Sequence, residues 1–142
     1  MIFGFSLGKI EVSGNKYQDM TNIQKGYQKL KVWQEAHKLV LMVYFLTNNF
    51  PNNETFGLIS HMRRAVVSIA ANIVEGHAKK SLKDFLRFLI IANGSLVELE
   101  YYLELSLSLK YLQQNDYEKI EQQRIIVGSL LNGFMKSVRS KM

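Results

Sequence analysis

The sequence of 142 residues has no cysteine and only one proline, Pro51. Without cysteine, disulfide scaffolds, thiolate metal sites and thiol nucleophiles are all excluded. No run approaches the ~20 uncharged apolar residues of a membrane span, because glutamates interrupt the most apolar segment at Glu98, Glu100 and Glu104. Residues 1–8 lack the basic region and long apolar stretch of a signal peptide. We therefore expect a cytoplasmic protein that does not enter the membrane.

Apolar residues make up 47% of the chain, which suits one globular domain with a sizeable core. Residues 1–26 show no sustained hydrophobic period and contain four glycines, so they are predicted to be a mobile N-terminal extension. Both Met1 and Met20 qualify as the start on sequence alone. The remaining residues, 27–142, form the predicted domain.

Four helical patterns fill this domain, at about residues 30–49, 54–76, 82–110 and from 115 onward. Each has an apolar seam that we expect to face the core. The expected seams are Trp33, His37, Val40, Tyr44 and Thr47; Ile59, Met62, Val66, Ile69 and Ile73; Leu82, Phe85, Leu89, Ala92, Leu96, Leu99 and Leu103; and Tyr117, Ile120, Arg124, Val127, Leu131, Phe134 and Val138. Short loops between four helices predict an all-α, antiparallel up-down-up-down four-helix bundle.

The helix ends and one mid-helix glycine carry further predictions. Gly76 suits a left-handed position after the second helix, and Ser81 and Asn115 suit N-caps of the third and fourth helices. Gly94 lies in the middle of the third helix, where it costs about 1 kcal/mol relative to alanine, so we expect a close helix crossing there.

The second and third helices also carry apolar strips outside their seams. We therefore expect other copies of the chain to cover them.

Several short elements, in this order, resemble a known family. They are Val32-Trp33, Phe50-Pro51, Glu54, Gly57-Leu58, Arg63-Arg64-Ala65, Ser68-Ile69, Asn72-Ile73, Glu75-Gly76, Gly94-Ser95 and Glu98-Leu99-Glu100. Together they resemble the four-helix bundle family also called the 23S rRNA intervening-sequence proteins. The resemblance implies a left-handed bundle that assembles as a ring, with a pentamer as the expected homo-oligomer. A related group of basic rings binds nucleic acid and a reverse transcriptase, but the resemblance implies no reaction.

Two adjacent arginines, Arg63 and Arg64, lie mid-helix between apolar neighbours. In an antiparallel hairpin they fall opposite the third helix, about one turn from Glu98, with Glu75 nearer the turn. We expect a structural ion-pair group of Arg63, Arg64, Glu98 and Glu75. The alternative is a catalytic or nucleic-acid-binding role for the arginines.

Basic residues collect at one end of the predicted bundle, which we call the basic pole. The topology brings together Lys25, Lys29, Lys31, Lys79, Lys80, Lys83, Arg87, Lys136, Arg139 and Lys141. Within this pole, the expected nucleic-acid-binding residues are Lys79, Lys80, Lys83, Arg87, Lys136 and Arg139. The net charge is +6, and its concentration at one end favours binding to phosphate backbones. The alternative is an ordinary solvated basic end.

Histidines 37, 61 and 77 fall on three different segments, and no glutamate has a histidine three residues later. Metalloprotease and P-loop motifs are also absent from the sequence. We therefore expect no cofactor, no metal and no enzymatic activity. The sequence favours a self-assembling helical scaffold that binds RNA or DNA. The alternative is a protein–protein adaptor whose ring docks a partner such as a polymerase-like enzyme.

Overall fold

A computed structural model describes residues 25–142 of the chain. The elements are η1 (Gly26–Lys29), α2 (Lys31–Thr47), η2 (Asn52–Glu54), α3 (Leu58–His77), α4 (Leu82–Ser108) and α5 (Gln114–Ser140). The part of the chain that is described contains no strand, and the predicted all-α four-helix bundle is confirmed. Most of the predicted extension, including Met20, lies outside the described residues; its last residue, Gly26, begins η1.

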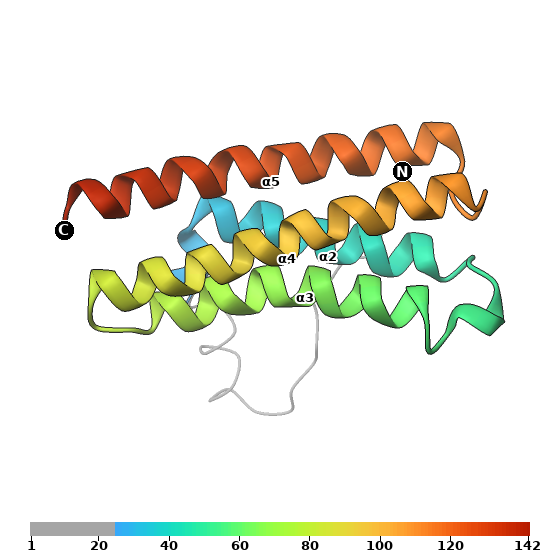
Figure 1. The fold of residues 1–142 in the computed structure, drawn as a ribbon. Helices are drawn as coiled ribbons and strands as arrows, with labels where there is room; N and C mark the ends of the chain where they lie inside the picture. Colours follow the sequence, from blue (N-terminus) through green and yellow to red (C-terminus); the bar gives the residue numbers. More distant parts are fainter. Residues whose placement is uncertain (1–24) are drawn as a thin grey trace, which may run out of the picture.

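The four long helices pack side by side, and consecutive helices run in opposite directions (Figure 1). Each helix contacts the next along the chain, and α2 also contacts α5, which closes the bundle. The α3–α4 turn, the start of α2 and the end of α5 lie toward the same end (Figure 1). Between residues 25 and 142, no helix is both long and apolar enough to cross a membrane.

The core follows the predicted seams of α3 and α4 closely. All five predicted α3 seam residues are buried, as are Leu89, Ala92, Leu96, Leu99 and Leu103 on α4. The other two predicted α4 residues are not fully buried. Phe85 is partly buried against the core, and Leu82, in the first turn of α4 at the end of the bundle, is 38% exposed.

The predicted inner stripe of α2 is wrong by about one residue. The buried residues are Val32, Ala36, Leu39, Met42, Val43 and Thr47, of which only Thr47 was expected. Trp33 instead lies at the edge of the core, where its ring stacks on His37 at 4.9 Å and meets Tyr27 edge-on at 5.1 Å. Since residues 39–46 are all apolar, the sequence period could not fix which face points inward.

Gly76 has a different role from the predicted one. It lies inside α3, which continues to His77, and it is buried. A Cβ at this position would lie 2.8 Å from Cβ of Phe88 and 3.0 Å from Cδ1 of Phe85. The glycine is therefore needed because α4 approaches α3 closely near their turn.

The predicted close crossing at Gly94 is absent from the part of the chain that the structure describes. A Cβ there would meet no atom of the described residues within 4 Å. Gly94 is exposed on the outer surface of α4. A contact that requires the glycine is therefore absent among residues 25–142.

The predicted caps had mixed outcomes. Ser81 caps α4 as expected, because its hydroxyl accepts a hydrogen bond from the Asp84 backbone N–H at 3.1 Å. Asn115 is not the cap of α5, which already begins at Gln114. The connection before α5 contains Lys110, which has a positive φ of 63°, and the buried Leu112. Gln113 occupies the N-cap position of α5.

Candidate nucleic-acid interface

The α3–α4 turn is the best-defined part of the basic pole. Gly76 allows α3 and α4 to approach closely, and Ser81 fixes the first turn of α4. Below the turn, the Phe85 ring packs edge-on against Phe134 of α5, with their centroids 5.4 Å apart. The same ring meets His77 edge-on at 6.1 Å. These contacts hold the turn against the rest of the bundle.

Two of the predicted site residues share one aromatic ring. The Lys79 ammonium lies 5.2 Å from the centroid of the Phe88 ring, and the Arg87 guanidinium lies 5.4 Å from the same centroid. Cations near an aromatic face are attracted by its quadrupole, worth about 0.5–1 kcal/mol at exposed sites. The Phe88 ring therefore brings the charges of Lys79 and Arg87 together.

Lys80 and Lys83 complete the basic group on this turn, and both are exposed. In the described part of the chain, none of Lys79, Lys80, Lys83 and Arg87 forms an ion pair within 4.0 Å. Two carboxylates, Glu75 and Asp84, are nearby in sequence and also exposed. The turn consequently presents four cations that remain available to an external anion.

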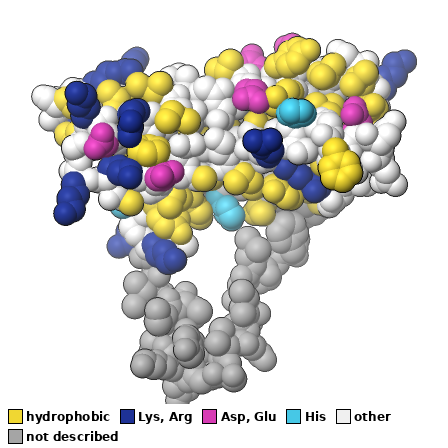
Figure 2. Space-filling view, turned by 60° about the horizontal axis from the view of Figure 1, so that its bottom comes forward, with side chains coloured by type: hydrophobic (Ala, Val, Ile, Leu, Met, Phe, Trp, Pro, Cys, Tyr) yellow, Lys and Arg dark blue, Asp and Glu magenta, His cyan; other side chains and the backbone are white. Residues whose placement is uncertain are grey.

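The other predicted site residues lie on the last turns of α5. Lys136 and Arg139 are exposed, while Met135 and Val138, the residues just before each of them, are buried and anchor the helix. Figure 1 shows this end of α5 on the same side of the molecule as the α3–α4 turn. Lys and Arg side chains gather at this end in Figure 2, with some carboxylates among them. The fold thus places the predicted binding residues at one pole.

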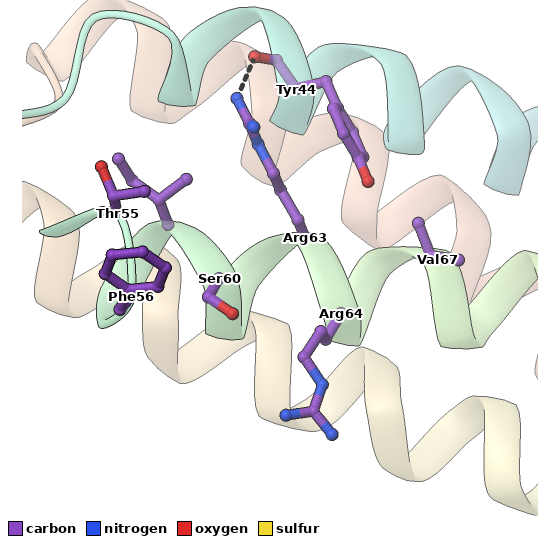
Figure 3. Close-up of a pocket in the computed structure, with 8 residues that line it drawn as sticks. Tyr44, Thr55, Phe56, Ser60, Arg63, Arg64 and Val67 are labelled. Atoms are coloured by element: carbon purple, nitrogen blue, oxygen red, sulfur yellow. Dashed lines mark hydrogen bonds between the residues drawn. The ribbon is translucent and has the colours of Figure 1, made fainter. Parts of the chain in front are cut away.

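The predicted ion pair between Arg63 and Glu98 is wrong. Arg63 turns toward α2 instead, where Nε donates to the Thr47 hydroxyl at 3.0 Å and Nη2 donates to Asn48 Oδ1 at 3.0 Å. A longer bond of 3.4 Å reaches the Tyr44 carbonyl, and the guanidinium lies 4.6 Å from the Tyr44 ring centroid (Figure 3).

Helix geometry explains the error. Adjacent residues on an α-helix point about 100° apart, so both arginines cannot face α4. Figure 3 shows Arg63 pointing to α2 and Arg64 pointing the other way. Arg64 lines a polar hollow of about 270 Å³ between α3 and α4, together with His61, Ala65, Ser68, Ser95 and Glu98.

The hollow is organised by hydrogen bonds and not by the predicted ion pairs. Ser68 and Ser95 join α3 to α4 through their hydroxyl oxygens at 2.8 Å. Glu98 accepts a hydrogen bond from the Tyr102 hydroxyl at 2.5 Å, which raises the pKa of Tyr102. Glu75 is exposed, and none of the four predicted partners forms an ion pair within residues 25–142.

Two polar links were missed by the sequence analysis. Arg124, expected in an apolar seam, donates to Glu121 and pairs with Glu100 of α4 at 3.3 Å. The Glu121 bonds raise the pKa of Arg124. The spacing of three residues between Glu121 and Arg124 was a usable signal for an ion pair.

The second missed link joins α2 to α5. Gln123 donates to the Glu35 backbone carbonyl at 3.0 Å and to its carboxylate at 2.7 Å. Lys31 pairs with the same carboxylate at 3.0 Å. The Gln123 bond, followed by the Lys31 bond, lowers the pKa of Glu35. No local sequence signal marks a pair 88 residues apart.

Comparisons with known proteins place the chain in a family. The model of the 23S rRNA-intervening sequence proteins matches residues 28–133. A similar solved structure is a Bacteroides thetaiotaomicron protein of unknown function from the S23 ribosomal protein family, with 27% identity and a TM-score of 0.68. The match covers 74% of this chain and 95% of that protein. No protein with a curated description matches. The chain belongs to the family of 23S rRNA-intervening sequence proteins.

Proposed function

We propose that the chain is a non-enzymatic, self-assembling helical scaffold that binds nucleic acid through its basic pole. One observation carries the proposal: the α3–α4 turn holds Lys79 and Arg87 over one aromatic ring and leaves Lys80 and Lys83 exposed beside them. Cations that are already held in place bind a polyanion more tightly, because their side chains lose less conformational entropy on binding.

Phosphate is the group that these cations suit. Lysine and arginine contacts to a phosphate backbone fix a protein on nucleic acid without reading its sequence. Each neutralised phosphate releases condensed counterions, so affinity falls steeply with salt. We therefore expect broad binding to nucleic acids with little base specificity from the turn itself.

Self-assembly is supported by an apolar stripe on the outer surface of α4. Ile90, Val97 and Tyr101 are 49%, 58% and 59% exposed, and Gly94 lies between them at helical spacing. A Cβ at Gly94 would meet open space, so the glycine leaves a shallow place where another helix can approach. We propose that a second copy of the chain covers this stripe, in a closed ring as the family resemblance implies.

Light scattering at micromolar concentration tests the assembly. We expect an oligomer for the wild type and a shift toward monomer for Val97→Glu, because a charge in an apolar interface is costly to bury. Lys119→Glu, an exposed change elsewhere, should leave the oligomer intact. A monomeric wild-type protein would contradict self-assembly.

A charge-reversal variant tests nucleic-acid binding. Replacing Lys79, Lys80 and Lys83 with glutamate should abolish a gel shift. Thermal melting should fall only slightly, because the three side chains are exposed and only the Lys79 contact with Phe88 is lost. In the matched control variant, glutamate replaces three other exposed lysines, Lys38, Lys110 and Lys119. Both triple variants lower the net charge by the same amount, so a difference reports on position. Equal losses in both variants would contradict a site at the α3–α4 turn.

An adaptor function is the second candidate, and one groove favours it. The groove lies against α2 and α3, measures about 410 Å³ and is lined by Tyr44, Thr55, Phe56, Ile59, Ser60, Arg63, Arg64 and Val67. Phe56 is 94% exposed, which is unusual for a large apolar side chain. If the wild type shifts neither single strands nor duplexes at low salt, docking of a protein partner becomes the better explanation.

A further inference from the structure

A second groove lies at the basic pole, between the start of α2 and the last turns of α5. It measures about 420 Å³, within the range of about 300–1,000 Å³ that is usual for small-molecule sites. The lining residues are Lys29, Leu30, Lys31 and Val32 on one wall and Ser129, Leu130, Gly133, Phe134 and Ser137 on the other. None of the proposed phosphate contacts on the α3–α4 turn lines it.

Most of the lining surface is apolar, with two lysines and two serines among the lining residues. Leu30, Leu130 and Phe134 are only partly buried and pack against the core from outside, so they leave apolar surface toward the groove. Ser129 and Ser137 add hydroxyl groups on the α5 wall. Gly133 keeps the groove open, because a Cβ there would meet no described atom within 4 Å. A flat ring with polar edges is the kind of group that such a lining accepts.

The charged residues that line the groove indicate the charge of its occupant. Two lysines, Lys29 and Lys31, line the groove, and no carboxylate does. Lys31 already pairs with Glu35, whereas Lys29 has no ion pair within residues 25–142. On α5, Lys136 lies next to the lining residue Ser137, and Arg139 lies two residues beyond it. The occupant should therefore join an apolar ring to a chain of negative charges.

We propose that this groove takes an unpaired nucleobase of a single-stranded nucleic acid whose phosphates lie on Lys29 and the other residues of the basic pole. The proposal rests on the proposed function, since the basic pole supplies the backbone contacts. An unpaired base can insert its apolar faces and offer its edge to serine hydroxyls. In a duplex the same faces are stacked and the edges are paired, so the groove should favour single strands.

Gly133 offers a direct test, because a side chain there fills the groove without crowding the core. Gly133→Leu should occupy the space, whereas the matched control Gly133→Ala adds only one methyl group. Both variants should fold, since leucine and alanine favour a helix more than glycine does. Thermal melting and light scattering check that fold and assembly are retained.

The binding probes are a fluorescein-labelled oligo(dT) and an abasic strand of the same length, measured by anisotropy. Both carry the same phosphates, but only the first carries bases. Wild type and Gly133→Ala should bind oligo(dT) about tenfold more tightly than the abasic strand, the size expected for a single base contact. Gly133→Leu should lose this preference and keep the affinity for the abasic strand.

The outcomes separate the two proposals. If the wild type binds both strands equally, or if Gly133→Leu keeps the preference for bases, the base-binding groove is wrong while phosphate binding stands. If the wild type binds neither strand at low salt, the nucleic-acid function itself fails. An apolar peptide that competes with oligo(dT) for the wild type but not for Gly133→Leu would assign the groove to a protein partner and overturn the inference.

Discussion

Arg63 on α3 donates an Nε–H hydrogen bond to the hydroxyl of Thr47 on α2, across 3.0 Å. Thr47 is buried, and its hydroxyl in turn donates to the Val43 carbonyl at 2.7 Å. The arginine also reaches Asn48 at the end of α2. Arg63 therefore ties the end of α2 to α3.

Replacing Arg63 with alanine should destabilise the fold. We expect a loss of about 1–3 kcal/mol, because hydrogen bonds from a charged group are removed and the buried Thr47 hydroxyl loses a donor. Glu98→Ala should cost much less, since its main partner is the hydroxyl of Tyr102 on the same helix. Urea unfolding measures both. Equal destabilisation by the two variants would contradict this account and support the Arg63–Glu98 ion pair expected from the sequence.

Stability should fall in mild acid because of Glu35. Its bonds to Gln123 and Lys31 lower its pKa in the folded state, whereas the unfolded chain titrates near the usual value of about 4.3. A lowered pKa adds stability that is present above about pH 4.3 and is lost as the pH falls through the folded value. The free energy of unfolding, measured by urea titration from pH 7 to pH 3, should show this loss.

Glu35→Gln should flatten this part of the pH profile, because the side chain can no longer titrate. Glu104→Gln, a change at an exposed position on α4, should keep the profile of the wild type. If Glu35→Gln leaves the acid limb as steep as before, other carboxylates carry the effect.

Gly76→Ala should destabilise the α3–α4 turn. The new Cβ would lie 2.8 Å from Cβ of Phe88, so α3 and α4 must move apart, at a cost of about 1–3 kcal/mol. Gly133→Ala is the matched control, because alanine there meets no described atom within 4 Å and favours the helix. Thermal melting of the two variants should therefore shift in opposite directions; a neutral Gly76→Ala would contradict the close packing.

Deleting residues 1–24 should weaken nucleic-acid binding only modestly. This segment carries Lys9 and Lys16 but also Glu11 and Asp19, so its removal leaves the net charge unchanged. Anisotropy with the same labelled strand compares full-length and shortened protein. If the shortened protein loses as much affinity as the triple charge-reversal variant, the binding site lies in the N-terminal segment and not at the α3–α4 turn.

The sequence predicted the helices and the α3 core well, because those helices alternate clear apolar and polar faces. It failed on α2, where apolar residues surround the helix and packing alone decides the inner face. Gly76 and Gly94 were both recognised as special, but only the neighbouring atoms show that Gly76 is crowded and Gly94 is open. The Gln123–Glu35 link could not be predicted, since it depends on how α2 and α5 align.

The grouping of the basic residues at one pole could be predicted from the sequence, because it depends only on the topology of the bundle. Alternating helix directions bring the α3–α4 turn and the end of α5 to one pole, so the basic residues could be grouped from the sequence. Arg63 and Arg64 could not be assigned, because a shift of one residue decides which neighbouring helix each side chain meets. The shared contact of Lys79 and Arg87 with Phe88 depends on side-chain positions that no spacing rule provides.

The dependence of affinity on salt tests the central claim most directly. Anisotropy of a labelled single strand, titrated with the wild-type protein between about 50 and 200 mM salt, gives the slope of log Kd against log salt. Several phosphate contacts at the basic pole predict tight binding at the lower salt concentration, a steep slope, and a clearly shallower slope when Lys80 and Lys83 are replaced with alanine. No binding at the lower concentration, or an affinity that does not change with salt, would contradict nucleic-acid binding through the basic pole.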